Sequence, residues 1–239
     1  ELLAGIFAIG SIAALFFHAL KKPVGEAIYA NKTPQNTIVI DNEEDAYKTL
    51  DAGWKWELKD ENGTTIIPYT ISQEYDPKRD EPLWYIYNDM RSFEQVGLGA
   101  RLRFAMDTIE SYADIRFVEN NEGKYDKDVS LYVADSIVNR LTKESFGGTT
   151  SGDPSKGVKV FISLENIDDN AQIPQISESF SPNQLNYEGL LHEIGHAVGL
   201  KHPFDVYENN PLTLAADLDN RDNSLMSYTR GFFHSEHYT

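Results

Sequence analysis

The chain has 239 residues, 38 of them acidic and 21 basic, which gives a formal net charge of −17. This acidic balance argues against a nucleic-acid partner and leaves carboxylates that could bind calcium. Because the chain has no cysteine, disulfides, cysteine-ligated zinc and a cysteine nucleophile are excluded, and a metal site must be built from His, Asp and Glu.

An uncharged, mostly apolar run from Leu2 to Leu20 opens the chain and ends at Lys21 and Lys22. Its length is just sufficient to cross a bilayer as a helix. Three interpretations stay open: a membrane anchor, the apolar core of a signal peptide, or a packed hydrophobic helix. We expect residues 1–22 to form a separate hydrophobic segment and residues 23–239 to form one domain that is truncated at its C-terminus.

Hydrophobic periodicity predicts strands alternating with helices in the central part of the chain. Trp54 and Trp56 alternate in a way that suits a strand with one exposed face. Helical periodicity extends over Phe93–Tyr112, and Ser92 could cap its start. β-Branched or alternating runs predict further strands at Thr64–Ile71, Ile115–Val118, Val129–Val133 and Gly157–Ile162. This order predicts an α/β (α+β) fold in which helices back a twisted mixed sheet.

A further helix is expected after Ser181. Ser181 is a suitable N-cap, Pro182 fits the first helical position, and Gln184 can complete a capping box. The helix is expected to run to about Val198, where Gly199 could end it in a left-handed turn.

The segment from His192 to His202 reads H-E-x-x-H-x-x-G-x-x-H. His192 and His196 are four residues apart, so one helical face presents both imidazoles to a single ion. The turn at Gly199 brings His202 back as a third ligand. Three neutral imidazoles leave a fourth position for water, which is the arrangement of catalytic zinc.

Glu193 follows the first of these histidines and is expected to project beside the ion as a general base. Zinc would acidify a bound water and polarise a carbonyl, while Glu193 takes the proton and delivers it to the leaving amine. The expected reaction is hydrolysis of a peptide bond. A site that binds metal without cleaving, and three histidines with no common role, are the alternatives.

The motif is the metzincin signature, and the chain resembles this family of zinc metallopeptidases. Ser224-Leu225-Met226-Ser227-Tyr228 resembles the methionine turn of the family, with Met226 24 residues after His202. In the family this methionine packs beneath the zinc-binding histidines, which implies that role for Met226. Ordinary core packing is the alternative for Met226.

Within the metzincins the chain is most similar to the serralysins, a group of secreted bacterial proteases, because Pro203 directly follows the third histidine and the turn has the Ser-x-Met-Ser-Tyr form. In serralysins and astacins the tyrosine of the turn is a zinc ligand that can swing away and stabilise the transition state. The resemblance implies that role for Tyr228, with a packed aromatic residue as the alternative. It is strong over about residues 187–230, weak over about 50–180 and absent over 1–45.

The resemblance implies a metzincin fold with an active-site helix beneath the sheet and a small C-terminal lobe after Gly199. Substrate is expected to lie extended and to add a strand to the sheet edge. The candidate edge is Ser145–Thr150, and its candidate substrate-binding residues are Phe146, Gly147, Gly148 and Thr149.

The same resemblance implies partners and a cofactor. The expected partners are protein or peptide substrates and a protein inhibitor, and the expected cofactor is Zn²⁺. Serralysins continue into a calcium-binding β-roll that this chain does not reach. Asp217, Asp219 and Asp222 are interpreted as a solvated acidic loop, with Ca²⁺ binding as the alternative. His234 and His237 are interpreted as surface residues.

The expected location is secreted or at the cell surface, with membrane anchoring through residues 2–20 still open. The alternative function is a non-catalytic zinc-containing module for binding or adhesion on the same fold. A third hypothesis makes the apolar start an inhibitory or anchoring segment of an otherwise ordinary protease.

Overall fold

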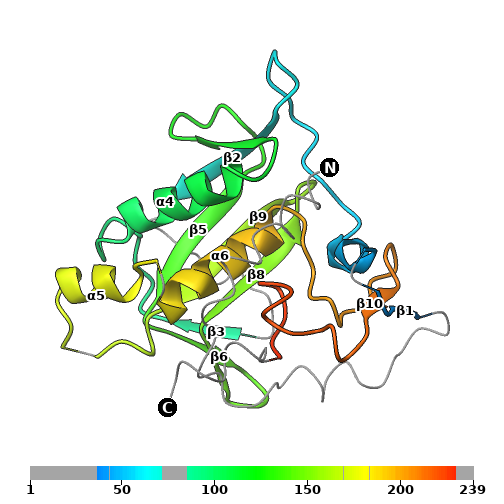
Figure 1. The fold of residues 1–239 in the computed structure, drawn as a ribbon. Helices are drawn as coiled ribbons and strands as arrows, with labels where there is room; N and C mark the ends of the chain where they lie inside the picture. The colour runs from blue at the N-terminus through cyan, green and yellow to red at the C-terminus, as the bar shows by residue number, and fades with distance from the viewer. Residues whose placement is uncertain (1–36, 43, 72–84, 169, 183, 230–239) are drawn as a thin grey trace. The chain divides into compact units, whose positions relative to one another are not determined.

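The computed structural model describes residues 37–42, 44–71, 85–168, 170–182 and 184–229 (Figure 1). The hydrophobic segment expected at residues 1–22 lies outside this part, as do His234 and His237. Within it, no helix combines the length and apolarity that a bilayer crossing needs. The chain divides into two compact units, Trp56–Val198 and a second unit that joins the residues up to Lys55 with those from Gly199 onward.

The unit Trp56–Val198 is built on a five-stranded mixed sheet in the order β4-β2-β5-β9-β8. The strands are β2 (Thr65–Ile71), β4 (Ile115–Glu119), β5 (Val129–Ala134), β8 (Gly148–Asp153) and β9 (Gly157–Ser163). Four of them pair in parallel, whereas β8 at the edge pairs antiparallel with β9. Four predicted strands are confirmed to within one residue at each end, namely those at residues 64–71, 115–118, 129–133 and 157–162. They form strands because their β-branched side chains fill the core of this sheet.

Three helices accompany the sheet: α4 (Gly99–Glu110), α5 (Ile173–Ser179) and α6 (Leu185–Ala197). Helix α6 packs against β8 and β9, and α4 packs against α6 and β4 (Figure 1). The fold is therefore α+β at the coarse level, as expected.

The predicted start of the first helix at Phe93 is wrong. Residues 93–97 form turns, in which Ser92 and Gln95 exchange hydrogen bonds between side chain and backbone. Gly97 then adopts a φ of 73°, which no α-helical residue has, so α4 begins only at Gly99.

The predicted start of the helix that carries His192 and His196 is also displaced. Its N-cap is Gln184 rather than Ser181. The reason is a short helix that the periodicity did not reveal, α5, which ends at Ser179 and leaves Ser181 in the connection between two helices.

The strand expected around Trp54 and Trp56 is not formed. Trp56 is 7% exposed, and its indole Nε1 donates a hydrogen bond to the carbonyl oxygen of Ala197 at 2.9 Å. Residue 56 therefore completes the C-terminal end of α6, where carbonyl groups lack helical partners, instead of joining a ladder.

A second, smaller sheet of the same unit joins β3 (Tyr85–Asn88), β6 (Ser136–Asn139) and β7 (Ser145–Phe146) in antiparallel pairs. Its aromatic rings pack onto the main sheet, since Tyr87 stacks on Phe161 with ring centroids 4.1 Å apart. Phe146 joins this cluster through an edge contact with Tyr85 at 5.4 Å. The cluster fixes the chain just before β8.

The other unit joins two distant parts of the sequence. β1 (Ile38–Ile40) pairs in parallel with β10 (Leu212–Leu214), and a 3-10 helix, η2, spans Ala46–Leu50. Lys201 is fully buried, and its Nζ donates to the carbonyl oxygens of Asp205 at 2.6 Å and Leu212 at 2.8 Å. These bonds fold the chain after Gly199 into a defined loop.

Candidate metal centre

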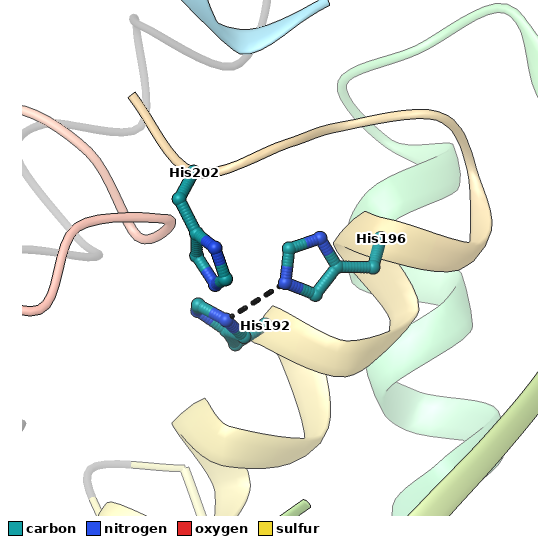
Figure 2. A group of neighbouring side chains, drawn as sticks. All are labelled: His192, His196 and His202. Atoms are coloured by element: carbon teal, nitrogen blue, oxygen red, sulfur yellow. Dashed lines mark hydrogen bonds between the residues drawn. The ribbon is translucent and has the colours of Figure 1, made fainter. Parts of the chain in front are cut away.

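Two of the predicted ligands lie on α6. His192 is 3% exposed, and its Nε2 lies 3.1 Å from Nε2 of His196, one helical turn later (Figure 2). In a tetrahedral zinc site with metal–nitrogen distances of about 2.0–2.1 Å, two ligand nitrogens lie about 3.3 Å apart. The pair is thus already spaced to bind one ion.

His202, the third candidate ligand, follows a turn at Gly199 that strongly favours glycine. Gly199 has a φ of 109°, and a Cβ at this position would lie 2.9 Å from the carbonyl oxygen of Trp54. The carbonyl of Gly199 in turn accepts a hydrogen bond from the Ala52 amide at 2.9 Å. These contacts hold the chain that leads to His202.

His192, His196 and His202 form a group whose ligand atoms all lie within 4.8 Å of one another (Figure 2). Among the described residues, this is the one group of at least three histidine or acidic side chains that could hold a metal ion. Three imidazole nitrogens suit zinc among the common biological cations, whereas calcium and magnesium prefer oxygen ligands.

His202 is oriented by a carboxylate that the sequence analysis did not single out. Asp205 Oδ2 lies 2.7 Å from Nδ1 of His202, which leaves the Nε2 atom of the ring for a metal. The ring of Phe204 stacks on the imidazole with centroids 4.9 Å apart and an interplanar angle of 4°. Both contacts restrict the orientation of the ring.

Glu193 directly follows His192 in the sequence and is buried, with 7% of its surface exposed. Burial raises the pKa of its carboxyl group to about 7, and the hydrogen bond from Thr150 opposes this shift. Thr150 Oγ1 lies 2.7 Å from Oε2 and 3.0 Å from the backbone oxygen of the same glutamate. A nearby dication would lower this pKa, because it favours the charged carboxylate.

Tyr228 and Met226 belong to the turn that ends the described chain. The Tyr228 ring lies beside that of His202, with centroids 4.5 Å apart, and 40% of the residue is exposed. Met226 is 1% exposed. Their predicted roles, as a zinc ligand and as a support beneath the histidines, stay predictions.

Hydrogen bonds between buried polar groups stabilise this turn. Ser227 Oγ donates to Asp219 Oδ1 at 2.6 Å, and Arg221 Nε donates to the Ser227 carbonyl at 3.3 Å. Burial raises the pKa of Asp219, while the bond from Ser227 acts against it. The interpretation of Asp219 as part of a solvated acidic loop is therefore wrong, since this residue is 8% exposed and serves the turn.

The predicted edge residues lie at the border of the main sheet. Phe146 ends β7, Gly147 connects the two strands, and Gly148 and Thr149 begin β8. Among the described strands, β8 is the last of the five in the main sheet. Substrate binding by these residues stays a prediction.

Sequence reasoning missed Thr150 as a partner of Glu193 and Asp205 as a partner of His202. The contact of Thr150 joins residues 43 positions apart, so no local pattern could reveal it. Asp205 lies only three residues after His202, so its contact with this histidine could have been predicted from the sequence.

No family model and no curated protein matches the chain. Among solved structures, it is similar to a chain of the "GM1 bound form of the ECX AB5 holotoxin", with 18% sequence identity and a TM-score of 0.29. The match covers 64% of this chain and 64% of that one. A similarity this low carries no argument about fold or function.

Proposed function

We propose that the chain is a zinc-dependent endopeptidase of the metzincin type, most similar to the serralysins, with His192, His196 and His202 as zinc ligands and Glu193 as general base. The observation that carries the proposal is the gathering of three imidazoles within 4.8 Å, with a buried glutamate directly after the first of them. Three histidine ligands leave one coordination position open, which distinguishes catalytic from structural zinc sites.

When bound, zinc would supply Lewis-acid activation of a water molecule and of the scissile carbonyl group. Glu193 would accept the proton of this water. Its Oε2 is engaged by Thr150, so Oε1 is the atom available to accept the proton and pass it to the leaving amine. The burial of the glutamate excludes bulk water from this transfer.

Tyr228 and β8 would complete the proposed active site. The exposed phenol beside His202 could donate a hydrogen bond to the oxygen on which negative charge develops. An extended peptide could pair with β8, because the strand is at the edge of the sheet as described.

The test compares wild-type protein with Glu193→Gln, which keeps the shape of the side chain and removes its basicity. We expect one zinc per chain in both proteins and cleavage of casein only by the wild type. The expected loss in kcat is on the order of 10²–10⁴-fold, the usual contribution of a general base.

Equal cleavage by both proteins would contradict the role of Glu193. Zinc in both proteins with cleavage by neither would contradict the peptidase proposal and favour a non-catalytic binding module.

A further inference from the structure

Strand β8 contacts Glu193 at two positions. The Thr150 hydroxyl reaches both Oε2 of Glu193, at 2.7 Å, and its backbone oxygen, at 3.0 Å. Gly148 lies so close that a Cβ built on it would be 2.7 Å from Cγ and 3.0 Å from Oε1. Residues 148 and 150 project from the same face of the strand, because side chains alternate along it.

The two carboxylate oxygens of Glu193 have different neighbours on β8. Oε2 is bound by a hydroxyl, whereas Oε1 lies over a residue that has no side chain. A single hydroxyl that reaches both the carboxylate and the main chain of one glutamate limits the rotation of that side chain.

We propose that β8 sets the position of the Glu193 carboxylate, with Thr150 as a positioning residue that holds Oε2 and Gly148 as the position that leaves room for Oε1. The catalytic consequence rests on the proposed peptidase function, in which Oε1 accepts the proton. The same strand is the candidate for pairing with substrate, so the strand that would bind the peptide also fixes the base.

The kinetic test compares Thr150→Val, which keeps the shape of the side chain without its hydroxyl, with Thr150→Ser, which keeps the hydroxyl. For Thr150→Val we expect kcat to fall about tenfold, with KM and zinc content unchanged, since the ligands stay and the base is misplaced. Thr150→Ser is expected to retain kcat to within about twofold. Gly148→Ala is expected to lower kcat with zinc retained, because its methyl group displaces the Glu193 side chain.

Thr70→Val is the matched control. Thr70 lies on β2 of the same sheet and donates its hydroxyl to a carboxylate oxygen of Asp128 at 2.6 Å. Its replacement removes the same kind of bond away from Glu193. It is expected to lower the melting temperature while leaving kcat and KM unchanged.

A second readout does not need cleavage. Infrared spectroscopy of zinc-loaded protein with ¹³C-labelled glutamate would identify the Glu193 carboxylate band by its loss in Glu193→Gln. The proposal expects this band to shift in Thr150→Val and to return in Thr150→Ser.

The two readouts separate the two proposals. If the wild type cleaves casein while Thr150→Val retains full kcat, or loses its zinc, the positioning role is overturned and the peptidase proposal stands. If the wild type does not cleave, the peptidase proposal fails, and the infrared band decides the positioning role: a shift supports it and an unchanged band overturns it.

Discussion

At the scale of single residues, the candidate metal centre combines three histidines with neighbouring groups that contact them. Asp205 Oδ2 lies 2.7 Å from Nδ1 of His202. Partners of this kind fix the tautomer of a ligand imidazole and raise its basicity. They are therefore expected to influence metal affinity without touching the metal.

Replacing Asp205 by Ala is predicted to weaken zinc binding by roughly 10–100-fold, the usual effect of removing such a partner. Competition with a chromophoric chelator would measure the dissociation constant. Asp217→Ala, which removes an exposed carboxylate from the following loop, is the control. An unchanged affinity in Asp205→Ala would show that His202 needs no support from this carboxylate.

The candidate ligands could be predicted from the sequence because their geometry is local. His192 and His196 are linked by helical periodicity, and His202 by a glycine turn three residues earlier. Thr150 could not be predicted in its role, because its contact with Glu193 depends on how a strand and a helix distant in sequence pack together.

At the scale of elements, α6 ends at Ala197, and the chain that follows it turns at Gly199. Gly199 turns with a φ of 109° next to the Trp54 backbone, and the Trp56 indole binds the Ala197 carbonyl. The sequence predicted the glycine turn, because few residues other than glycine adopt a positive φ. It did not predict the indole cap, since Trp54 and Trp56 alternate as residues of a strand also do.

Gly199→Ala is predicted to lower the free energy of unfolding by about 1–3 kcal/mol, because alanine is strained at this φ and its Cβ approaches the Trp54 oxygen. Gly189→Ala is the matched variant in the same region. Gly189 lies within α6 and has open space around its Cβ position, so the change is expected to stabilise by about 0.5–1 kcal/mol. Denaturant titration measures both values, and equal effects of the two substitutions would contradict this account of the turn.

At the scale of the whole molecule, the α+β class and most strands of the main sheet could be predicted, because each element carries its own periodicity. The pairing of distant chain segments in the second unit could not be predicted. Its strands β1 and β10 pair across most of the described chain, with Ile38 opposite Leu212, and each has only three residues. Such short non-local pairings leave no pattern that local sequence reasoning can detect.

Metal binding is predicted to stabilise the folded chain as a whole. A ligand at 1,000 times its dissociation constant stabilises the folded state by about 4 kcal/mol. For a chain of this size that corresponds to a rise in Tm on the order of 10 °C. Calorimetry with chelator, and again after zinc is restored, would measure the difference. Glu193→Gln should keep the full shift because Glu193 is not a proposed ligand, and an identical Tm with and without zinc would contradict the prediction.

The most direct test of the central claim is X-ray absorption spectroscopy at the zinc edge on protein loaded with one equivalent of the metal. We predict a first shell of nitrogen and oxygen atoms only, with outer-shell scattering from three imidazoles. Scattering from fewer imidazoles, or a signal that His196→Ala leaves unchanged, would contradict a centre built by His192, His196 and His202.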